Sequence, residues 1–203
     1  IMIKNIIFDF GDIFINLDKV KFAEEIQKLG IPQHQDEVIQ ILHKYEMGLV
    51  STDYFLSYFH ETYHIDKEAL LTVWNSILLD FPKKRFDFLK DLMLSNKYRL
   101  FLLSNTNDLH ISWIKKNWGF ELYNDFKNCF EQFYLSHEIH FRKPNPDIYD
   151  FVLTKNQLKV HETFFIDDTK ENTDAASKLG IHVWNLNPKN EDVTELFLKH
   201  NLN

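Results

Sequence analysis

Apolar residues along the chain follow three successive patterns, which predict a strand, a long helical stretch and then alternating helices and strands. The segment from Lys4 to Ile13 opens with a short run rich in Ile and Phe, without alternating polar positions. Such a run is typical of a strand buried on both faces. The run ends at Asp9, and Gly11 and Asp12 follow closely. Burying a carboxylate is costly unless something pairs with it, so this strand end is a candidate site, although Asp9 capping a turn would also explain the pattern.

Residues 19–79 show helical periodicity only. Apolar side chains recur at helical spacing in four successive segments, and Ser51 and Asp66 stand where helix N-caps are expected. Because strands are predicted before and after this stretch, the four consecutive helices predict an inserted, all-helical module.

Helices and strands alternate from residue 82 onwards. Apolar runs predict strands at residues 98–103, 130–135, 163–166 and 182–184. Helical patterns occur at residues 86–93, 109–114, 146–152, 170–179 and 191–200. Strands separated by helices in this way form parallel sheets. We therefore predict an α/β fold with a Rossmann-like, doubly wound parallel sheet, a core domain of residues 1–17 and 82–203, and a helical cap domain of residues 18–81.

Reactive side chains stand where the predicted strands end. They are Asp9 after the first strand, Ser104 and Asn105 after the second, and Asp167 and Asp168 after the strand at residues 163–166. Lys143 adds an ammonium group in a Pro-bounded loop before a helix. The carboxyl ends of parallel strands meet at one edge of a sheet, so we expect these groups to converge. Carboxylate oxygens suit Mg²⁺, whereas a hydroxyl, an ammonium group and turn amides suit phosphoryl oxygens.

In this order the four features resemble the motifs of the haloacid dehalogenase superfamily, over essentially the whole chain. The closer likeness is to the branch of sugar-1-phosphate phosphatases, such as those acting on α-D-glucose 1-phosphate. The phrases that carry it are Phe8-Asp9-Phe10-Gly11, Leu103-Ser104-Asn105-Thr106-Asn107, Arg142-Lys143-Pro144, Phe165-Ile166-Asp167-Asp168 and Tyr45-Glu46-Met47-Gly48 with Ser51. A structural explanation exists for each residue alone, such as a helix cap or a solvated lysine, but the motifs together are specific. The resemblance implies a Rossmann-like core with an inserted cap of the helical C1 type.

The resemblance also implies a role for each motif residue. Asp9 would be the nucleophile that forms an aspartyl-phosphate, with Lys143 as the second catalytic residue. Phosphate binding would fall to Phe10, Gly11, Ser104, Asn105 and Lys143. The Mg²⁺ ligands would be Asp9, the carbonyl of Gly11, Asp168 and, directly or through water, Asp167. Most of the catalytic stabilisation would then come from the metal ion, the lysine and backbone amides.

Gly11 departs from the family pattern. Most members carry a second Asp there, which serves as general acid and base, whereas here the carboxylate belongs to the next residue, Asp12. In an extended chain a shift by one residue turns the side chain to the other side, although in a turn this argument weakens. Loss of general acid–base help costs roughly 10²–10⁴-fold, so the reaction would be slowed rather than abolished. We hypothesise a leaving group that needs little protonation, such as an anomeric or acyl phosphate.

The predicted cap would close over the sheet edge and exclude water. Glu46, Trp74 and Asn75 are candidate substrate contacts within it, and Asp12 is a further candidate in the core. A solvated Glu and a core Trp are equally compatible with the pattern.

Two further features have weak functional interpretations. His60-Glu61-Thr62-Tyr63-His64 matches the zinc-protease pattern, which requires both histidines on one continuous helix face. Because Asp66 starts the next helix, we expect the preceding helix to end near His64, which would disfavour a zinc site. The single cysteine, Cys129, has no evident activating partner, so we expect a small core residue rather than a nucleophile.

Charge and cysteine content limit the partners. The formal net charge is −7 over 203 residues, and there is no basic stripe, so we expect no nucleic-acid or membrane partner. A small phosphorylated molecule remains possible because a metal ion or a few cations can reverse the local field. One cysteine excludes internal disulfides and fits a reducing compartment. With no signal peptide or transmembrane run, we expect a cytoplasmic protein, monomeric or, as the alternative, dimeric.

We therefore predict an Mg²⁺-dependent phosphatase that acts on a small phosphorylated metabolite, above all a sugar phosphate. A 2-haloacid dehalogenase needs no metal, so the Asp167–Asp168 pair argues against it. A phosphomutase must protonate and deprotonate sugar hydroxyls, so Gly11 argues against it. A third alternative, a phospho-ligand binder with weak or no turnover, remains open because of Gly11.

Overall fold

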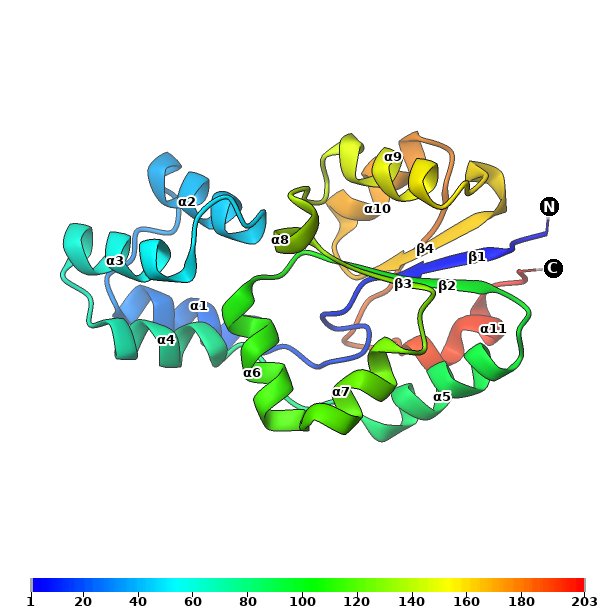
Figure 1. Cartoon of the computed structure of the whole chain (residues 1–203), viewed down its shortest axis with the longest axis horizontal. Coiled ribbons are helices and arrows are strands. Elements are labelled where there is room, and N and C mark those ends of the chain that lie inside the picture. The colour runs from blue at the N-terminus through cyan, green and yellow to red at the C-terminus, as the bar shows by residue number, and fades with distance from the viewer. Residues whose placement is uncertain (1, 203) are drawn as a thin grey trace.

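Five parallel strands form the centre of the computed structural model, which describes residues 2–202 (Figure 1). The strands are β1 (Asn5–Phe8), β2 (Arg99–Ser104), β3 (Gln132–Leu135), β4 (Thr163–Asp167) and β5 (His182–Asn185). Their order across the sheet is β3-β2-β1-β4-β5. Strand β1 is central, with Phe8 opposite Leu102 on one side and Ile166 on the other. The prediction of a doubly wound parallel sheet is confirmed.

Helices cover both faces of the sheet, which explains why its strands read as unbroken apolar runs. One face carries α5 (Lys83–Leu94), α6 (Asp108–Trp118), α7 (Phe120–Lys127), the 3₁₀ turn η2 (Val193–Glu195) and α11 (Leu196–Lys199). The other face carries α9 (Pro146–Lys155) and α10 (Lys170–Lys178). Two short elements complete the core, α8 (Ser136–Ile139) after β3 and the 3₁₀ turn η1 (Val160–Glu162) before β4.

The core on the α5–α7 face is built around aromatic rings, which accounts for much of the high Phe content. Phe126 is fully buried, and its ring packs at 5.1–5.2 Å, centroid to centroid, from those of Phe10, Phe14 and Phe130. Phe126 belongs to α7, a helix that the hydrophobic pattern did not predict. The reason is its brevity: only Tyr123 and Phe126 of its residues are buried, too few to establish a period. Cys129 is buried in the same core, as expected.

Four helices lie between β1 and α5, as the periodicity predicted. They are α1 (Lys19–Lys28), α2 (Asp36–Glu46), α3 (Thr52–Tyr63) and α4 (Lys67–Asn75), and they enclose a hydrophobic core of their own. The expected N-caps are present, because Ser51 accepts a hydrogen bond from the Tyr54 amide and Asp66 accepts one from that of Ala69. Figure 1 shows this helical group beyond the carboxyl ends of the strands. No helix in the described part of the chain is both long and apolar enough to cross a bilayer.

The helical group is joined to the sheet domain by two segments that run side by side. The amide of Asn16 donates to the carbonyl of Asp80, and that of Asp18 donates to the carbonyl of Ile77, both at 2.9 Å. A second junction lies at α8, where the Ser136 hydroxyl donates to the Glu46 carbonyl at 2.6 Å. Gly48 approaches α8 so closely that a Cβ there would lie 2.0 Å from the carbonyl oxygen of His137. The helical group is therefore held over one edge of the sheet from two sides.

This close approach predicts that Gly48→Ala destabilises the protein beyond the usual cost of an alanine at positive φ. Gly48 has a φ of +64°, and the added methyl meets backbone that cannot move aside easily. Gly30→Ala is the matched control, since Gly30 has a φ of +79° and a methyl group added there would meet nothing within 4 Å. In urea denaturation we expect a loss of about 1 kcal/mol for Gly30→Ala and at least twice that for Gly48→Ala. Equal losses would contradict the close contact.

Candidate active site

The predicted reactive side chains meet at the carboxyl edge of the sheet. Asp9 follows β1, Ser104 ends β2 and Asp167 ends β4, so the three come from neighbouring strands. Lys143 reaches the same place from the loop between α8 and α9. All four side chains belong to buried residues. The expected convergence is therefore observed.

Lys143 is the centre of this arrangement. Its Nζ donates to Asp9 Oδ1 at 2.7 Å, to Asp167 Oδ2 at 2.6 Å and to the carbonyl oxygen of Leu103 at 2.8 Å. The residue is only 1 % exposed. Burial lowers the pKa of Lys143, but the two carboxylates outweigh burial and raise it above its ordinary value. The side chain is thus a permanently charged ammonium group with all three protons directed at named acceptors.

Asn105 holds the backbone that carries this lysine. Its side-chain Oδ1 accepts from the Lys143 amide at 2.9 Å, and its Nδ2 donates to the Lys143 carbonyl at 2.8 Å. Both ends of the Asn105 amide group are therefore engaged by the chain itself, which leaves positioning of Lys143 as the observed task of this side chain.

Asp167 is fixed by several donors. Its Oδ1 accepts from the Thr169 amide at 2.8 Å, and Asn172 Nδ2 donates to both carboxylate oxygens at 3.0–3.2 Å. With Lys143 on Oδ2 and no exposed surface, this carboxylate is saturated by the protein. The arrangement favours contact with a metal ion through water over direct ligation, which were the two options left open for Asp167.

The Asp9 carboxyl group has a raised pKa. Burial raises its pKa, Lys143 lowers it, and the neighbouring Asp167 and Asp168 raise it further, with a net value of about 7. The pKa of Asp168 is also raised, mainly by burial. Raised pKa values at neighbouring carboxylates mark a site with too little positive charge.

A divalent cation fits this deficit. Asp9, Asp167 and Asp168 each offer a carboxylate oxygen, and these atoms lie within 4.8 Å of one another. This is the only such group of acidic, histidine or cysteine side chains in the described residues. A hard oxygen donor set with excess negative charge suits Mg²⁺.

Asp12 joins this cluster through Lys19, whose ammonium group it shares with Asp168. Its φ is +58°, and its Oδ1 accepts from the Leu17 amide at 3.0 Å, closing the turn after β1. Its Oδ2 pairs with Lys19 Nζ at 2.8 Å. The carboxylate thus faces Lys19, so Asp12 does not replace an acid at position 11. Leu17 occupies that region instead, since a Cβ on Gly11 would lie 2.7 Å from its Cδ1 atom.

Two adjoining cavities lie between the sheet edge and the helical group. The polar one, about 310 Å³, is lined by Asp9, Gly11, Leu17, Lys19, Glu46, Asn105, Arg142, Lys143, Pro144, Asp168, Thr169, Glu171 and Asn172. The other, about 280 Å³, is lined largely by apolar side chains, among them Phe10, Leu42, Trp74 and Ile77, together with Ser104 and His110. Gly11, Leu17, Glu46 and Asn105 line both cavities, so a ligand reaching from one into the other would pass these four residues.

The predicted cap contacts divide between cleft and interior. Glu46 lines both cavities, and its Oε2 pairs with Arg142 Nε at 3.0 Å across the junction. Trp74 lines the apolar cavity, and its Nε1 donates to Asn107 Oδ1 at 3.3 Å. Asn75 lines neither cavity, because it stands at the end of α4 with its Oδ1 buried.

Three residues of the site carried no recognisable signal in sequence. Lys19 and Asn172 are ordinary polar residues at a helix start and in a helix turn, and only folding brings them to the strand ends. His110 looked like one of several scattered histidines, yet it stacks on Trp74 and lines the apolar cavity. The regular placement of reactive residues at strand ends does not extend to these positions.

The zinc-protease pattern does not form a metal site. Helix α3 ends at Tyr63, and His64 adopts a left-handed conformation with a φ of +56°. His60 uses its Nδ1 for a 2.9 Å hydrogen bond with the Ile65 carbonyl. The expected end of the helix near His64 is confirmed.

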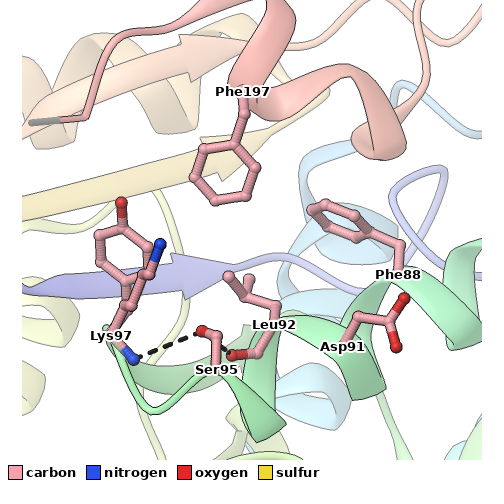
Figure 2. A pocket seen from close by; sticks show the side chains of 7 residues that line it. Phe88, Asp91, Leu92, Ser95, Lys97 and Phe197 are labelled. Atoms are coloured by element: carbon pink, nitrogen blue, oxygen red, sulfur yellow. Dashed lines mark hydrogen bonds between the residues drawn. The ribbon is translucent and has the colours of Figure 1, made fainter.

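A further cavity of about 380 Å³ lies at the opposite edge of the sheet (Figure 2). It lies between α5 and α11, and the ring of Phe197 packs against those of Phe88 and Tyr98. Tyr98 directly precedes β2, which places this cavity at the amino ends of the strands, away from Asp9. Its lining includes two charged residues, Asp91 and Lys97, and no cluster of reactive groups.

Comparison with known proteins agrees with this geometry. The family model described as haloacid dehalogenase-like hydrolase matches residues 6–186. A D-ribitol-5-phosphate phosphatase from Bacteroides thetaiotaomicron is 30% identical over 197 residues, covering 90% of this chain and 91% of that protein.

Two solved structures are also similar over nearly their full length. The HAD family enzyme bt-2542 from Bacteroides thetaiotaomicron, in complex with magnesium and inorganic phosphate, has a TM-score of 0.79 at 35% identity, covering 96% of this chain and 99% of its own. A predicted HAD-like family hydrolase from Porphyromonas gingivalis has a TM-score of 0.77 at 26% identity, covering 91% of each chain.

The buried His110 predicts a specific loss of stability in acid. Its Nε2 lies 3.0 Å from the Trp74 carbonyl, and burial lowers its pKa from 6.5 to about 4. The unfolded chain therefore takes up this proton first as the pH falls, so the contribution of His110 to stability is lost between pH 6.5 and 4. The difference in pKa corresponds to at most about 3 kcal/mol.

We expect His110→Gln to lose less stability than the wild type between about pH 7 and pH 4, as measured by urea denaturation. The exposed His161 provides the control variant His161→Gln, which should follow the wild-type profile. Parallel profiles for His110→Gln and the wild type would show that His110 is not held neutral.

Proposed function

Because this chain belongs to the haloacid dehalogenase-like hydrolase family, we propose that it is an Mg²⁺-dependent phosphatase that hydrolyses a small phosphorylated metabolite. The observation that carries the proposal is the buried Lys143 ammonium group bridging Asp9 and Asp167 at the strand ends. The bt-2542 complexes with magnesium and phosphate support the choice of metal and ligand.

The donor set supports a metal site at the carboxyl edge. Asp9, Asp168 and the carbonyl of Gly11 would hold Mg²⁺, with Asp167 acting through water because its own oxygens are already hydrogen-bonded. When bound, the ion would polarise the phosphoryl group and neutralise charge that develops on its oxygens. The excess of carboxylates over ammonium groups supports this assignment independently of the family.

We propose that catalysis proceeds by two displacements at phosphorus. In the first, an oxygen of Asp9 forms a bond to phosphorus while the bond to the leaving oxygen breaks, giving an aspartyl-phosphate and an alkoxide that takes up a proton from water. In the second, water attacks phosphorus and releases Asp9 and inorganic phosphate. Lys143 and the Ser104 hydroxyl would hold the phosphoryl oxygens, while Asn105 and Asp167 keep the lysine in place.

The residues around Gly11 determine whether the protein can donate a proton to the leaving group. The space beside it is filled by the apolar Leu17, and Asp12 points to Lys19. Neither neighbour offers a proton there, so the first displacement proceeds with weak general acid help. This favours the hypothesis that good leaving groups, such as an anomeric oxygen, react faster than simple alkoxides.

The apolar cavity supports a proposal for the class of leaving group. Its walls combine rings and aliphatic side chains, such as Trp74 and Leu42, with polar residues that could meet hydroxyl groups, of which Glu46 stands at the boundary with the polar cavity. The other polar residues of the lining are Ser104, Asn105, Thr106, Asn107 and His110. Its volume of about 280 Å³ suits a small metabolite. We propose that residues 18–81 act as the cap that encloses this group and that a sugar or polyol phosphate is the substrate class.

Among the alternatives, the phospho-ligand binder requires a direct test, because a binder and a phosphatase would use the same binding residues. The dehalogenase is disfavoured by the acidic metal site, and the mutase by the lack of an acid–base residue at Gly11. A binder would retain Mg²⁺ and phosphate without releasing product.

Removal of the nucleophile separates enzyme from binder. With Mg²⁺ present, we expect the wild type to release phosphate in steady state and Asp9→Asn to lose at least roughly 10³-fold in kcat, because a neutral amide replaces the nucleophilic carboxylate. Asp174→Asn makes the same chemical change at an exposed position on α10 and should keep wild-type activity. Wild-type protein that binds phosphate without turnover would identify a binder.

A substrate panel tests the leaving-group hypothesis. D-ribitol 5-phosphate is the substrate in the name of the Bacteroides phosphatase, and its leaving group is the alkoxide of a primary carbon. The leaving group of a sugar 1-phosphate is the anomeric oxygen of the sugar. We expect kcat for the sugar 1-phosphate to be higher, because it needs less protonation. If simple alkyl phosphates turn over as fast as sugar 1-phosphates, the hypothesis fails while the phosphatase assignment stands.

A further inference from the structure

Lys19 places a second ammonium group beside the carboxylate cluster. It is the first residue of α1, at the point where the chain enters the helical group. Its Nζ pairs with Asp168 Oδ2 at 2.5 Å and with Asp12 Oδ2 at 2.8 Å. The side chain is half exposed, and the residue lines the polar cavity together with Asp9 and Lys143.

The two lysines of this cavity hold different carboxylates. Lys143 is buried and bridges Asp9 to Asp167, whereas Lys19 reaches in from the surface and bridges Asp12 to Asp168. Asp168 is also the carboxylate that would ligate Mg²⁺ directly. An ammonium group and a metal ion at one carboxylate repel each other, and each is stabilised by the same negative charge. Binding of one therefore weakens binding of the other.

The backbone of Asp168 is held by a contact that does not involve Lys19. Asn185 Nδ2 donates to the backbone carbonyl of Asp168 at 2.9 Å and so helps to fix the turn from the neighbouring strand β5. Lys19 therefore pairs with the Asp168 carboxylate but does not hold the turn that carries it.

Asp12 gives the lysine an alternative partner. Its Oδ1 is anchored by the Leu17 amide, so its Oδ2 remains directed at Lys19 whichever carboxylate the ammonium group favours. Its left-handed backbone turns the side chain toward Lys19. Asp12 can therefore keep Lys19 paired when Asp168 binds another cation.

We propose that Lys19 is an internal cation that competes with Mg²⁺ for Asp168, and that Asp12 is the carboxylate that retains Lys19 once the metal ion is bound. The proposal rests on the metal site of the proposed function. Lys19 and Asp12 are in this sense positioning residues, because they act on the metal ion through Asp168. Together they set the Mg²⁺ affinity of the site.

The test is a calorimetric titration of the full-length, metal-free protein with MgCl₂ alone, in the absence of phosphate. We expect Lys19→Met to bind Mg²⁺ roughly tenfold more tightly than the wild type, because the competing charge is removed. Lys21→Met is the matched control: it removes the same charge from an exposed position of the same helix and should change the affinity less than about twofold.

Asp12→Asn distinguishes direct competition from a general field effect. Asn tolerates the left-handed backbone and can still accept from the Leu17 amide. In the wild-type background we expect this change to weaken Mg²⁺ binding several-fold, because Lys19 then pairs with Asp168 alone. In the Lys19→Met background the same change should have little effect. Equal effects of Asp12→Asn in both backgrounds would contradict its retaining role.

The outcomes separate this proposal from the proposed function. Unchanged or weaker Mg²⁺ binding by Lys19→Met would overturn the competition, whereas phosphate release by the wild type would leave the phosphatase assignment intact. If neither protein binds Mg²⁺, the competition is also overturned, and the metal site of the proposed function fails with it. Urea denaturation of each variant shows whether it is folded before the titration is interpreted.

Discussion

The buried ammonium group of Lys143 is the interaction on which the site depends. A charged lysine that is 1 % exposed is tolerated only with close counter-charges, and here Asp9 and Asp167 supply them from two adjacent strands. The lysine stabilises both carboxylates, so removing Lys143 would leave two buried carboxylates without this counter-charge. Their placement at the strand ends follows from the parallel sheet, which brings distant parts of the sequence to one edge.

This requirement explains the surrounding polar structure. Asn105 holds the lysine backbone, and Asn172 with the Thr169 amide holds Asp167, so each charged group has its own support. The same cluster retains more carboxylates than ammonium groups, and this surplus is what gives it a use for a divalent cation. The helical group then covers this edge and adds the apolar cavity beside it.

Much of the fold and the centre of the site could be predicted from sequence, because both are carried by local patterns. Unbroken apolar runs mark buried strands, and Asp9, Ser104 and Asp167 stand directly at their ends. Helix α7 escaped because two buried residues do not establish a period. Asp12 and Lys19 could not be predicted as a pair, because their contact depends on a turn of left-handed backbone rather than on spacing. The substrate is equally beyond reach, since the residues lining the apolar cavity are dispersed along the chain.

The central claim is that an oxygen of Asp9 attacks phosphorus and forms a covalent intermediate. The stereochemical course of hydrolysis tests it most directly. The substrate is a phosphorothioate monoester made chiral at phosphorus by two oxygen isotopes, hydrolysed in water that carries the third isotope, and the configuration of the thiophosphate product is determined by phosphorus NMR. Each in-line displacement inverts phosphorus, so an aspartyl-phosphate followed by attack of water predicts net retention of configuration. Net inversion would mean a single attack by water and would contradict the role of Asp9 as nucleophile.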